Sequence, residues 1–84
     1  MYIVASDYDG TLKQNGIVSK SDLEAIRQFQ KAGHLFGIIT GRAVMSIRGE
    51  LEDFGVPIDF LISANGAHLA LVLQSNQAHL QNSS

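Results

Sequence analysis

The chain has 84 residues, of which 45% are hydrophobic and 17% are charged, and its formal net charge is -2. This length allows one small domain at most, the composition is too apolar for a disordered chain, and the weakly acidic balance excludes the broad basic surface of a nucleic-acid-binding protein. There is no cysteine, no signal-peptide core and no run of about 18 apolar residues that could cross a membrane, so we expect a cytoplasmic protein without a membrane partner.

The first third of the chain predicts a strand, a loop and a helix. Residues 2–5 form a short apolar run that stops just before Asp7, which is typical of a buried parallel strand. Residues 13–18 contain glycine and polar residues, and we expect a loop there. Ser21 with Glu24 has the capping-box spacing that begins the helix that follows, and Ser19 with Asp22 is an alternative start. Gly33 then suits the left-handed end of that helix.

The middle of the chain predicts a second strand, a second helix and a third strand. Residues 35–39 and 58–62 are the two apolar runs expected as strands. The helix between them is indicated by apolar residues at helical spacing, and Gly55 ends it. These apolar residues are Val44, Ile47, Leu51 and Phe54. Strands alternating with helices predict an α/β fold: a partial doubly wound (Rossmann-like) parallel sheet of three strands with two crossover helices.

The end of the chain differs in composition from the rest. After Asp59 there is no charged residue, and Asn65-Gly66 is a strong turn signal. Apolar residues at 67, 69, 71 and 73 alternate as in the second strand of a hairpin, while a helix through Leu69, Leu73 and Leu80 fits almost as well. We therefore divide the chain into a core part, residues 1–67, and a charge-free tail, residues 68–84. An uncovered strand in this tail predicts a homo-oligomer formed through the C-terminal segment.

Polar residues follow each of the three predicted parallel strands. Asp7 and Asp9 follow the first strand, Thr40 and Gly41 the second, and Asn65 the third. Because ligands of parallel sheets bind outside the carboxyl ends of the strands, we expect these residues to converge on one site. Two carboxylates there can hold Mg²⁺ against phosphate oxygens. One carboxylate can also attack phosphorus while the other acts as general acid and base, and the Thr40 hydroxyl and Gly41 N–H can bind a phosphate oxygen.

Three segments of the sequence carry a family resemblance. Residues 7–12 read Asp-Tyr-Asp-Gly-Thr-Leu and resemble the first motif of the haloacid dehalogenase (HAD) superfamily of phosphohydrolases. Residues 40–42, Thr-Gly-Arg, and 63–67, Ser-Ala-Asn-Gly-Ala, resemble segments of its Cof-type phosphatase branch. The resemblance implies that Asp7 is the nucleophile and a Mg²⁺ ligand and that Asp9 is the general acid/base, with its backbone carbonyl also on Mg²⁺. It also implies that Thr40 binds phosphate and that Asn65 faces the substrate.

Other parts of the family pattern are missing from the sequence. The family's third motif supplies a Lys, but the only lysines here are at 13, 20 and 31. The acidic fourth motif and the substrate-selecting cap domain are also lacking. We therefore expect a truncated Mg²⁺-dependent phosphatase of small phosphorylated metabolites, using an aspartyl-phosphate intermediate and weak or inactive alone. The alternative is a non-catalytic, self-associating module that binds Mg²⁺ and phosphate.

Several site residues also have ordinary structural interpretations. Thr40 could cap the second helix, and Arg42 could be a surface residue of that helix as well as a phosphate ligand. Asn65 with Gly66 could be a hairpin turn without a role in binding. The three histidines show no ligand spacing, and we expect no metal site from them.

Overall fold

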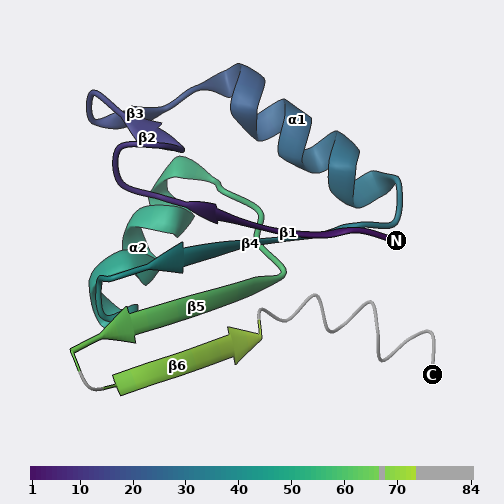
Figure 1. The fold of residues 1–84 in the computed structure, drawn as a ribbon. Helices are drawn as coiled ribbons and strands as arrows, with labels where there is room; N and C mark the ends of the chain where they lie inside the picture. The colour runs from purple at the N-terminus through teal and green to yellow at the C-terminus, as the bar shows by residue number, and fades with distance from the viewer. Residues whose placement is uncertain (67, 74–84) are drawn as a thin grey trace.

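A computed structural model of the chain describes residues 1–66 and 68–73 as one four-stranded sheet, two helices and a small hairpin (Figure 1). The sheet has the order β1-β4-β5-β6, in which β1, β4 and β5 are parallel and β6 is antiparallel to β5. The strands of the sheet are β1 (Ile3–Asp7), β4 (Leu35–Thr40), β5 (Phe60–Asn65) and β6 (His68–Leu73). The predicted α/β class with three parallel strands is confirmed.

The segment expected to be a loop forms a second, two-stranded sheet. Its strands β2 (Lys13–Gln14) and β3 (Ile17–Val18) pair antiparallel. The residues between them, Asn15 and Gly16, have φ of 53° and 81°. A two-residue hairpin turn of type I′ needs positive φ angles at both of its central residues, and Asn-Gly is a dipeptide that adopts them readily. The expectation of a loop at residues 13–18 was therefore wrong, although the turn signal was present in the sequence.

Helix α1 (Lys20–Lys31) begins at the second of the two predicted caps. Ser19 has extended backbone angles, and its Oγ accepts a hydrogen bond of 3.1 Å from the backbone N–H of Asp22. This bond satisfies one of the amides that the first turn of a helix leaves without a partner. The prediction of a start at Ser21 with Glu24 was therefore wrong, and the alternative start at Ser19 is confirmed. At the other end, Gly33 has φ of 95°, as expected for a left-handed helix end.

Helix α2 (Val44–Phe54) connects β4 to β5. No side chain caps its first turn, because the residue at the cap position is Ala43. Gly55 ends the helix with φ of 69°, as expected. Strand β4 contains Gly37, whose register partner is Phe60. A Cβ built on Gly37 would lie within 2.5 Å of three Phe60 ring carbons, so the ring lies directly on the glycine and requires it to have no side chain.

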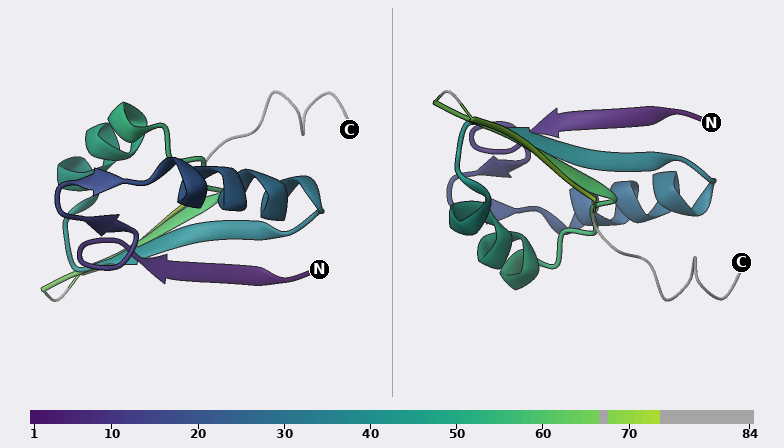
Figure 2. Two further views of the ribbon diagram at one scale, coloured as in Figure 1. Left: turned by 90° about the horizontal axis from the view of Figure 1, so that it is seen from above. Right: turned by 90° about the horizontal axis from the view of Figure 1, so that it is seen from below.

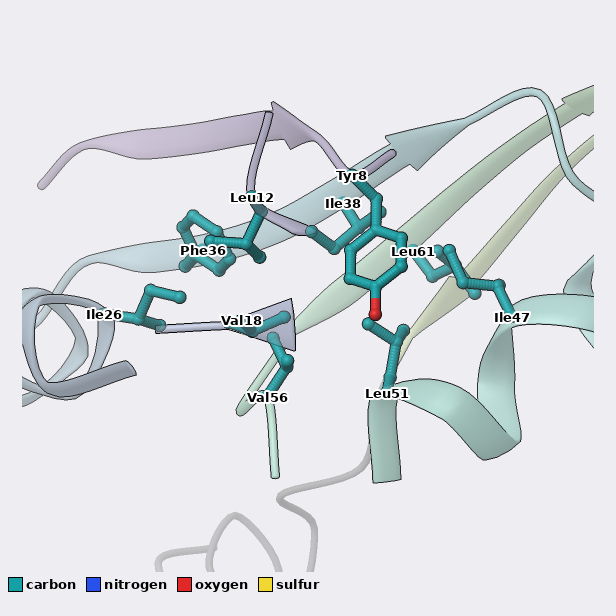
Figure 3. Packing of buried hydrophobic residues seen from close by; sticks show 10 residues of the cluster. All are labelled: Tyr8, Leu12, Val18, Ile26, Phe36, Ile38, Ile47, Leu51, Val56 and Leu61. Atoms are coloured by element: carbon teal, nitrogen blue, oxygen red, sulfur yellow. The ribbon is translucent and has the colours of Figure 1, made fainter. Parts of the chain in front are cut away.

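Both helices cover the same face of the sheet (Figure 2). This arrangement follows from the strand order, because two crossovers of one hand that step in the same direction place their helices on one side. Figure 3 shows the resulting core, in which the buried residues of β4 and β5 meet those of the helices and the hairpin. The core consists of Tyr8, Leu12, Val18, Ile26, Phe36, Ile38, Ile47, Leu51, Val56 and Leu61.

Neither helix of the described residues has the length and hydropathy needed to cross a membrane.

The C-terminal hairpin is formed as one of the two predicted alternatives. Six register pairs join β5 to β6, from Phe60 with Leu73 to Asn65 with His68. The helix through Leu69 and Leu73 is wrong for these residues, and Leu80 lies outside the described residues. Leu69, Leu71 and Leu73 are 75%, 63% and 72% exposed, because no helix of the described chain covers that face of the sheet.

Candidate functional site

The parallel strands bring the predicted site residues of β1 and β4 to one hollow. In the sheet register Asp7 lies opposite Ile39, so the carboxyl ends of the two strands are level. The hollow has a volume of about 280 Å³. It is lined by Asp7, Tyr8, Asp9, Ile39, Thr40, Gly41 and Arg42. Four of the five residues predicted from strand ends therefore lie around the same space, although their proposed roles stay predictions.

The loop after β1 presents its two carboxylates while burying the residue between them. Tyr8 is only 1% exposed and its ring lies in the core, so Asp7 and Asp9 flank an inward-pointing side chain (Figure 3). The Tyr8 carbonyl accepts hydrogen bonds from the backbone N–H groups of Thr11, at 3.2 Å, and Lys13, at 2.8 Å. Gly10 has φ of 81°, which a residue with a side chain rarely adopts. The tight turn therefore holds Asp9 beside Asp7.

The Tyr8 hydroxyl is buried without a hydrogen-bond partner among the described residues. Burial raises the pKa of this phenol well above its ordinary value, and the negative charges of Glu50 and Asp9 raise the pKa further. The phenol is therefore neutral at neutral pH. Its contribution to the site is to hold the loop to the core through its ring.

Thr40 and Arg42 form the wall of the hollow on the β4 side. Thr40 is 8% exposed, and its Oγ1 accepts a hydrogen bond of 3.1 Å from the backbone N–H of Arg42. The cap position of α2 belongs to Ala43, so the interpretation of Thr40 as the helix cap is wrong. Ser63 supports this turn from β5, because its hydroxyl donates a 2.6 Å hydrogen bond to the Arg42 carbonyl.

Asn65 lies next to this turn but is not part of the wall of the hollow. Its side-chain Nδ2 donates a 2.9 Å hydrogen bond to the Gly41 carbonyl. Its backbone pairs with His68 at the end of the hairpin. Asn65 therefore joins the third strand end to the second. Its predicted contact with a substrate stays a prediction.

A group of charged side chains beside the hollow was missed in the sequence. Arg42 Nη1 lies 3.1 Å from Glu50 Oε2 and 3.3 Å from Asp9 Oδ1, and Lys13 Nζ lies 2.9 Å from Glu50 Oε1. Lys13 and Arg42 lower the pKa of the Glu50 carboxyl, and Glu50 in turn raises the pKa of Arg42. The ion pair between Arg42 and Glu50 is therefore favoured in its charged form.

The sequence signals for this charged group are weak. Ser46 and Glu50 are four residues apart on α2 and extend the spacing that begins at Arg42, so a shared helix face could have been noticed. Lys13 is 37 residues from Glu50, and no local pattern predicts that pair. Ser63 was part of a quoted motif but was not assigned a contact.

The donor set at the hollow suits a partly hydrated Mg²⁺. Asp7 and Asp9 both line the space, and the described residues contain no cluster of three or more carboxylate, histidine or cysteine ligands. Mg²⁺ commonly binds through one or two carboxylates, with waters and substrate phosphate oxygens completing six ligands. Asp7 and Asp9 are therefore the residues that would hold the ion.

The family can now be compared with this geometry. The family model described as haloacid dehalogenase-like hydrolase matches residues 4–84. The chain belongs to this family. The match includes Asp7 and Asp9, which line the hollow described above.

Two relatives of this HAD-like chain are phosphatases. The 5-amino-6-(5-phospho-D-ribitylamino)uracil phosphatase YwtE of Bacillus subtilis (strain 168) is 40% identical over 67 residues, which are 79% of this chain and 22% of that protein. The solved structure of BT1666 from Bacteroides thetaiotaomicron, described among phosphatases of the HAD superfamily, matches with a TM-score of 0.68 and 33% identity. That match covers 84% of this chain and 26% of the other. The chain thus spans about a quarter or less of the length of these relatives.

Proposed function

We propose that this chain forms the nucleophile half of a Mg²⁺-dependent phosphatase site for small phosphorylated metabolites. The observation that carries the proposal is the hollow at the ends of β1 and β4, which is lined by Asp7, Asp9 and Thr40. The Thr40 hydroxyl holds the turn after β4 by accepting a hydrogen bond from the backbone N–H of Arg42. Phosphatase relatives and membership in the HAD-like family support the same reaction class. YwtE is named for a phosphorylated ribityl compound, which supports a small phosphate monoester as the substrate class.

In the proposed reaction, Asp7 and Asp9 carry the covalent steps. An Asp7 oxygen attacks phosphorus and forms an acyl phosphate, while the bond from phosphorus to the leaving oxygen breaks and Asp9, protonated, gives its proton to that oxygen. Water then attacks the acyl phosphate as Asp9 takes up its proton, which restores Asp7 and releases phosphate. Bound Mg²⁺ would supply positive charge between the carboxylates and the phosphate.

The absence of a lysine after residue 31 limits the rate expected of this chain alone. In this family a Lys neutralises the nucleophile and the phosphate, and one such electrostatic group is worth about 3–4 kcal/mol of transition-state stabilisation. Turnover by the 84-residue chain should therefore be about a hundred- to a thousandfold slower than in a site that has the lysine.

Asp7→Asn tests the proposal directly. We expect the wild-type chain to release phosphate from an aryl phosphate slowly and only with Mg²⁺, and Asp7→Asn to fall to the background rate. Asp53→Asn, on the exposed side of α2, is the matched control and should keep the wild-type rate. Equal release by the wild type and Asp7→Asn would refute the proposed nucleophile.

The second candidate is a binding module that holds Mg²⁺ and phosphate without turnover and associates with itself. Two observations favour it: the missing lysine, and the exposed leucines of β6 on an uncovered sheet face. Such a module would bind Mg²⁺ without releasing phosphate from the aryl ester. Formation of an acyl phosphate at Asp7 would rule this candidate out.

The cytoplasmic location and the division of the chain at residue 67 stay predictions.

A further inference from the structure

Strand β6 lies at one edge of the sheet, and its outer side has no strand partner among the described residues (Figure 1). Two residues separate Asn65 from His68, so this first pair of the hairpin is the hydrogen-bonded end of a two-residue turn. Hydrogen-bonded and non-hydrogen-bonded pairs alternate along antiparallel strands. The backbone N–H and C=O groups of Leu69, Leu71 and Leu73 therefore point away from β5, toward the free edge.

This edge lacks the features that prevent strands of different molecules from pairing. Proteins protect edge strands with charged side chains, prolines, bulges or a very short strand. The sequence of β6, His-Leu-Ala-Leu-Val-Leu, contains no Asp, Glu, Lys, Arg or Pro, and its register with β5 runs without a bulge. At six residues, β6 is as long as β4 and β5. The free edge can therefore accept a further strand.

The opposite edge of the sheet, β1, is less suited to pairing with a copy of itself. Antiparallel pairing of two β1 strands about Ala5 would place Asp7 opposite Ile3 and Ser6 opposite Val4. Each of these pairs joins a polar side chain to an apolar one, which gives little stabilisation across strands. Asp7 also lines the hollow, so the second copy would lie against the site. The edge that favours a second copy is therefore β6.

The sequence of β6 is complementary to itself. Antiparallel pairing about Leu71 places the two copies of Leu71 opposite each other and Leu69 opposite Leu73. Ala70 then lies opposite Val72, on the side of the sheet where Val72 packs against the core. The exposed leucines of both copies come together on the uncovered face, and no like charges meet. A twofold axis at Leu71 closes this interface, because both β6 edges are then occupied.

We propose that β6 is a docking edge for a second copy of this chain, and that two sheets join there into one continuous sheet about Leu71. This pairing gives a specific surface to the homo-oligomer expected from the sequence. The hollow of each copy stays free, because it lies at the ends of β1 and β4, and β5 separates those strands from β6. The pairing is therefore independent of the proposed reaction, and failure of one leaves the other standing.

Single cysteines test the register of this pairing, because the sequence has no cysteine of its own. The two Cα atoms at position 71 would lie about 5.5 Å apart, within the range that a disulfide spans. We expect Leu71→Cys to form a covalent dimer under mild oxidation, measured by non-reducing gel electrophoresis. Leu69→Cys is the matched control and should not cross-link to itself, because its two copies would lie about 14 Å apart.

A mixture of Leu69→Cys and Leu73→Cys chains should form the cross-linked heterodimer, since these positions lie opposite each other in the proposed pair. Cross-linking of Leu69→Cys to itself as fast as that of Leu71→Cys would refute the register.

Leu71→Pro and Leu71→Ala separate pairing of the edges from stacking of the uncovered faces. Both remove the leucine side chain, but only proline also removes the N–H that points to the free edge. We expect Leu71→Pro to weaken association about tenfold more than Leu71→Ala in sedimentation velocity, because each copy loses a donor. Equal weakening would show that the faces stack and would overturn the proposal, as would a wild-type chain that stays monomeric. Circular dichroism checks the fold of the proline variant, and the cysteine register decides if that variant does not fold.

Discussion

The carboxylate of Asp59 completes the hydrogen bonding of strand β4. Pairing between β4 and β5 begins at Gly37 with Phe60, so Phe36 has no strand neighbour on that side. Its N–H donates instead to Asp59 Oδ2 at 2.9 Å, and its carbonyl accepts from the Asp59 N–H at 2.7 Å. The carboxylate also accepts a 3.1 Å hydrogen bond from Gln30 of α1. One side chain therefore ties the start of the central strand to a helix.

Removing this carboxylate should destabilise the fold. In Asp59→Ala the Phe36 N–H, which belongs to a buried residue, loses its partner, and the free energy of unfolding should fall by about 1–3 kcal/mol. Urea denaturation measures this change. Asp53→Ala, which removes an exposed carboxylate from α2, should change the free energy of unfolding by less than about 0.5 kcal/mol. An equal loss in the two variants would contradict the role given to Asp59.

At the level of single residues, the sequence predicts a site residue well when its place is set by the end of a strand. Asp7 and Thr40 lie at the hollow because each ends a parallel strand, and strand ends can be located from apolar runs. The contacts of Arg42 depend on how α2 is rotated against the loop after β1. That rotation is a result of core packing, which no local pattern encodes, so the choice between a surface and a phosphate-binding Arg42 could not be made from the sequence.

The loop after β1 and helix α2 are linked through a single carboxylate. Glu50 accepts from Lys13 with one oxygen and from Arg42 with the other. Lys13 begins β2 and Arg42 precedes α2, so Glu50 connects two elements that are distant in sequence. The loop that carries Asp9 is thereby held against the helix.

This link predicts that stability depends on pH in a defined direction. The pKa of Glu50 is lower in the folded chain than its ordinary value of 4.5, so the unfolded chain binds more protons as the pH approaches that value. The stabilisation is therefore complete near pH 7 and is lost as the pH falls below about 4.5. The pKa values of Arg42 and Tyr8 are both raised, so Arg42 stays charged and Tyr8 stays neutral over this range.

Glu50→Gln isolates the effect. We expect it to lower the free energy of unfolding at pH 7 and to have a smaller effect at pH 3, where part of the stabilisation by the ionised Glu50 is already lost. Chemical denaturation at the two pH values measures the difference, and Glu52→Gln on the exposed side of α2 controls for the loss of one charge. A cost that is the same at both pH values would show that the charge of Glu50 is unimportant.

Among the elements, long apolar patterns were predicted well and short ones poorly. Helix α2 ends at Gly55 as expected, because a left-handed glycine is a clear local signal. The hairpin of β2 and β3 was missed because its strands have two residues each, too few for an alternating pattern. The sequence alone did not decide between a strand and a helix for residues 68–73. The strand forms because these residues pair with β5, and that pairing depends on the rest of the sheet.

On the scale of the whole molecule, the sheet has one covered and one uncovered face. The helices bury Ile38 and Leu61 on one side, while Ile39 and Leu71 on the other side are 38% and 63% exposed. The sequence predicted three parallel strands with two crossover helices, because strands and helices alternate along the chain. It did not predict which face stays open, because a strand pattern does not reveal how many helices are available to cover it.

The open face predicts self-association that a single charge can weaken. We expect the chain to form dimers or larger species as its concentration rises, and Leu71→Lys to weaken the association about tenfold or more, since burying one leucine is worth about 1.5–3 kcal/mol. Sedimentation velocity measures both. Met45→Lys is the matched control, because Met45 is 93% exposed on α2, on the helix side of the sheet. A chain that stays monomeric at all concentrations, or an equal effect of both variants, would contradict the prediction.

Because Tyr8 is buried between the two site aspartates, its intrinsic fluorescence can report on the site. The sequence contains two tyrosines and no tryptophan, so its near-ultraviolet emission comes from Tyr8 and Tyr2 alone. Tyr2 is 70% exposed and lies at the opposite end of β1 from the site, whereas Tyr8 is enclosed directly beneath it. A Tyr2→Phe chain would leave Tyr8 as the sole emitter. Ions and phosphate compounds could then be screened against the unlabelled protein by the intensity of one residue.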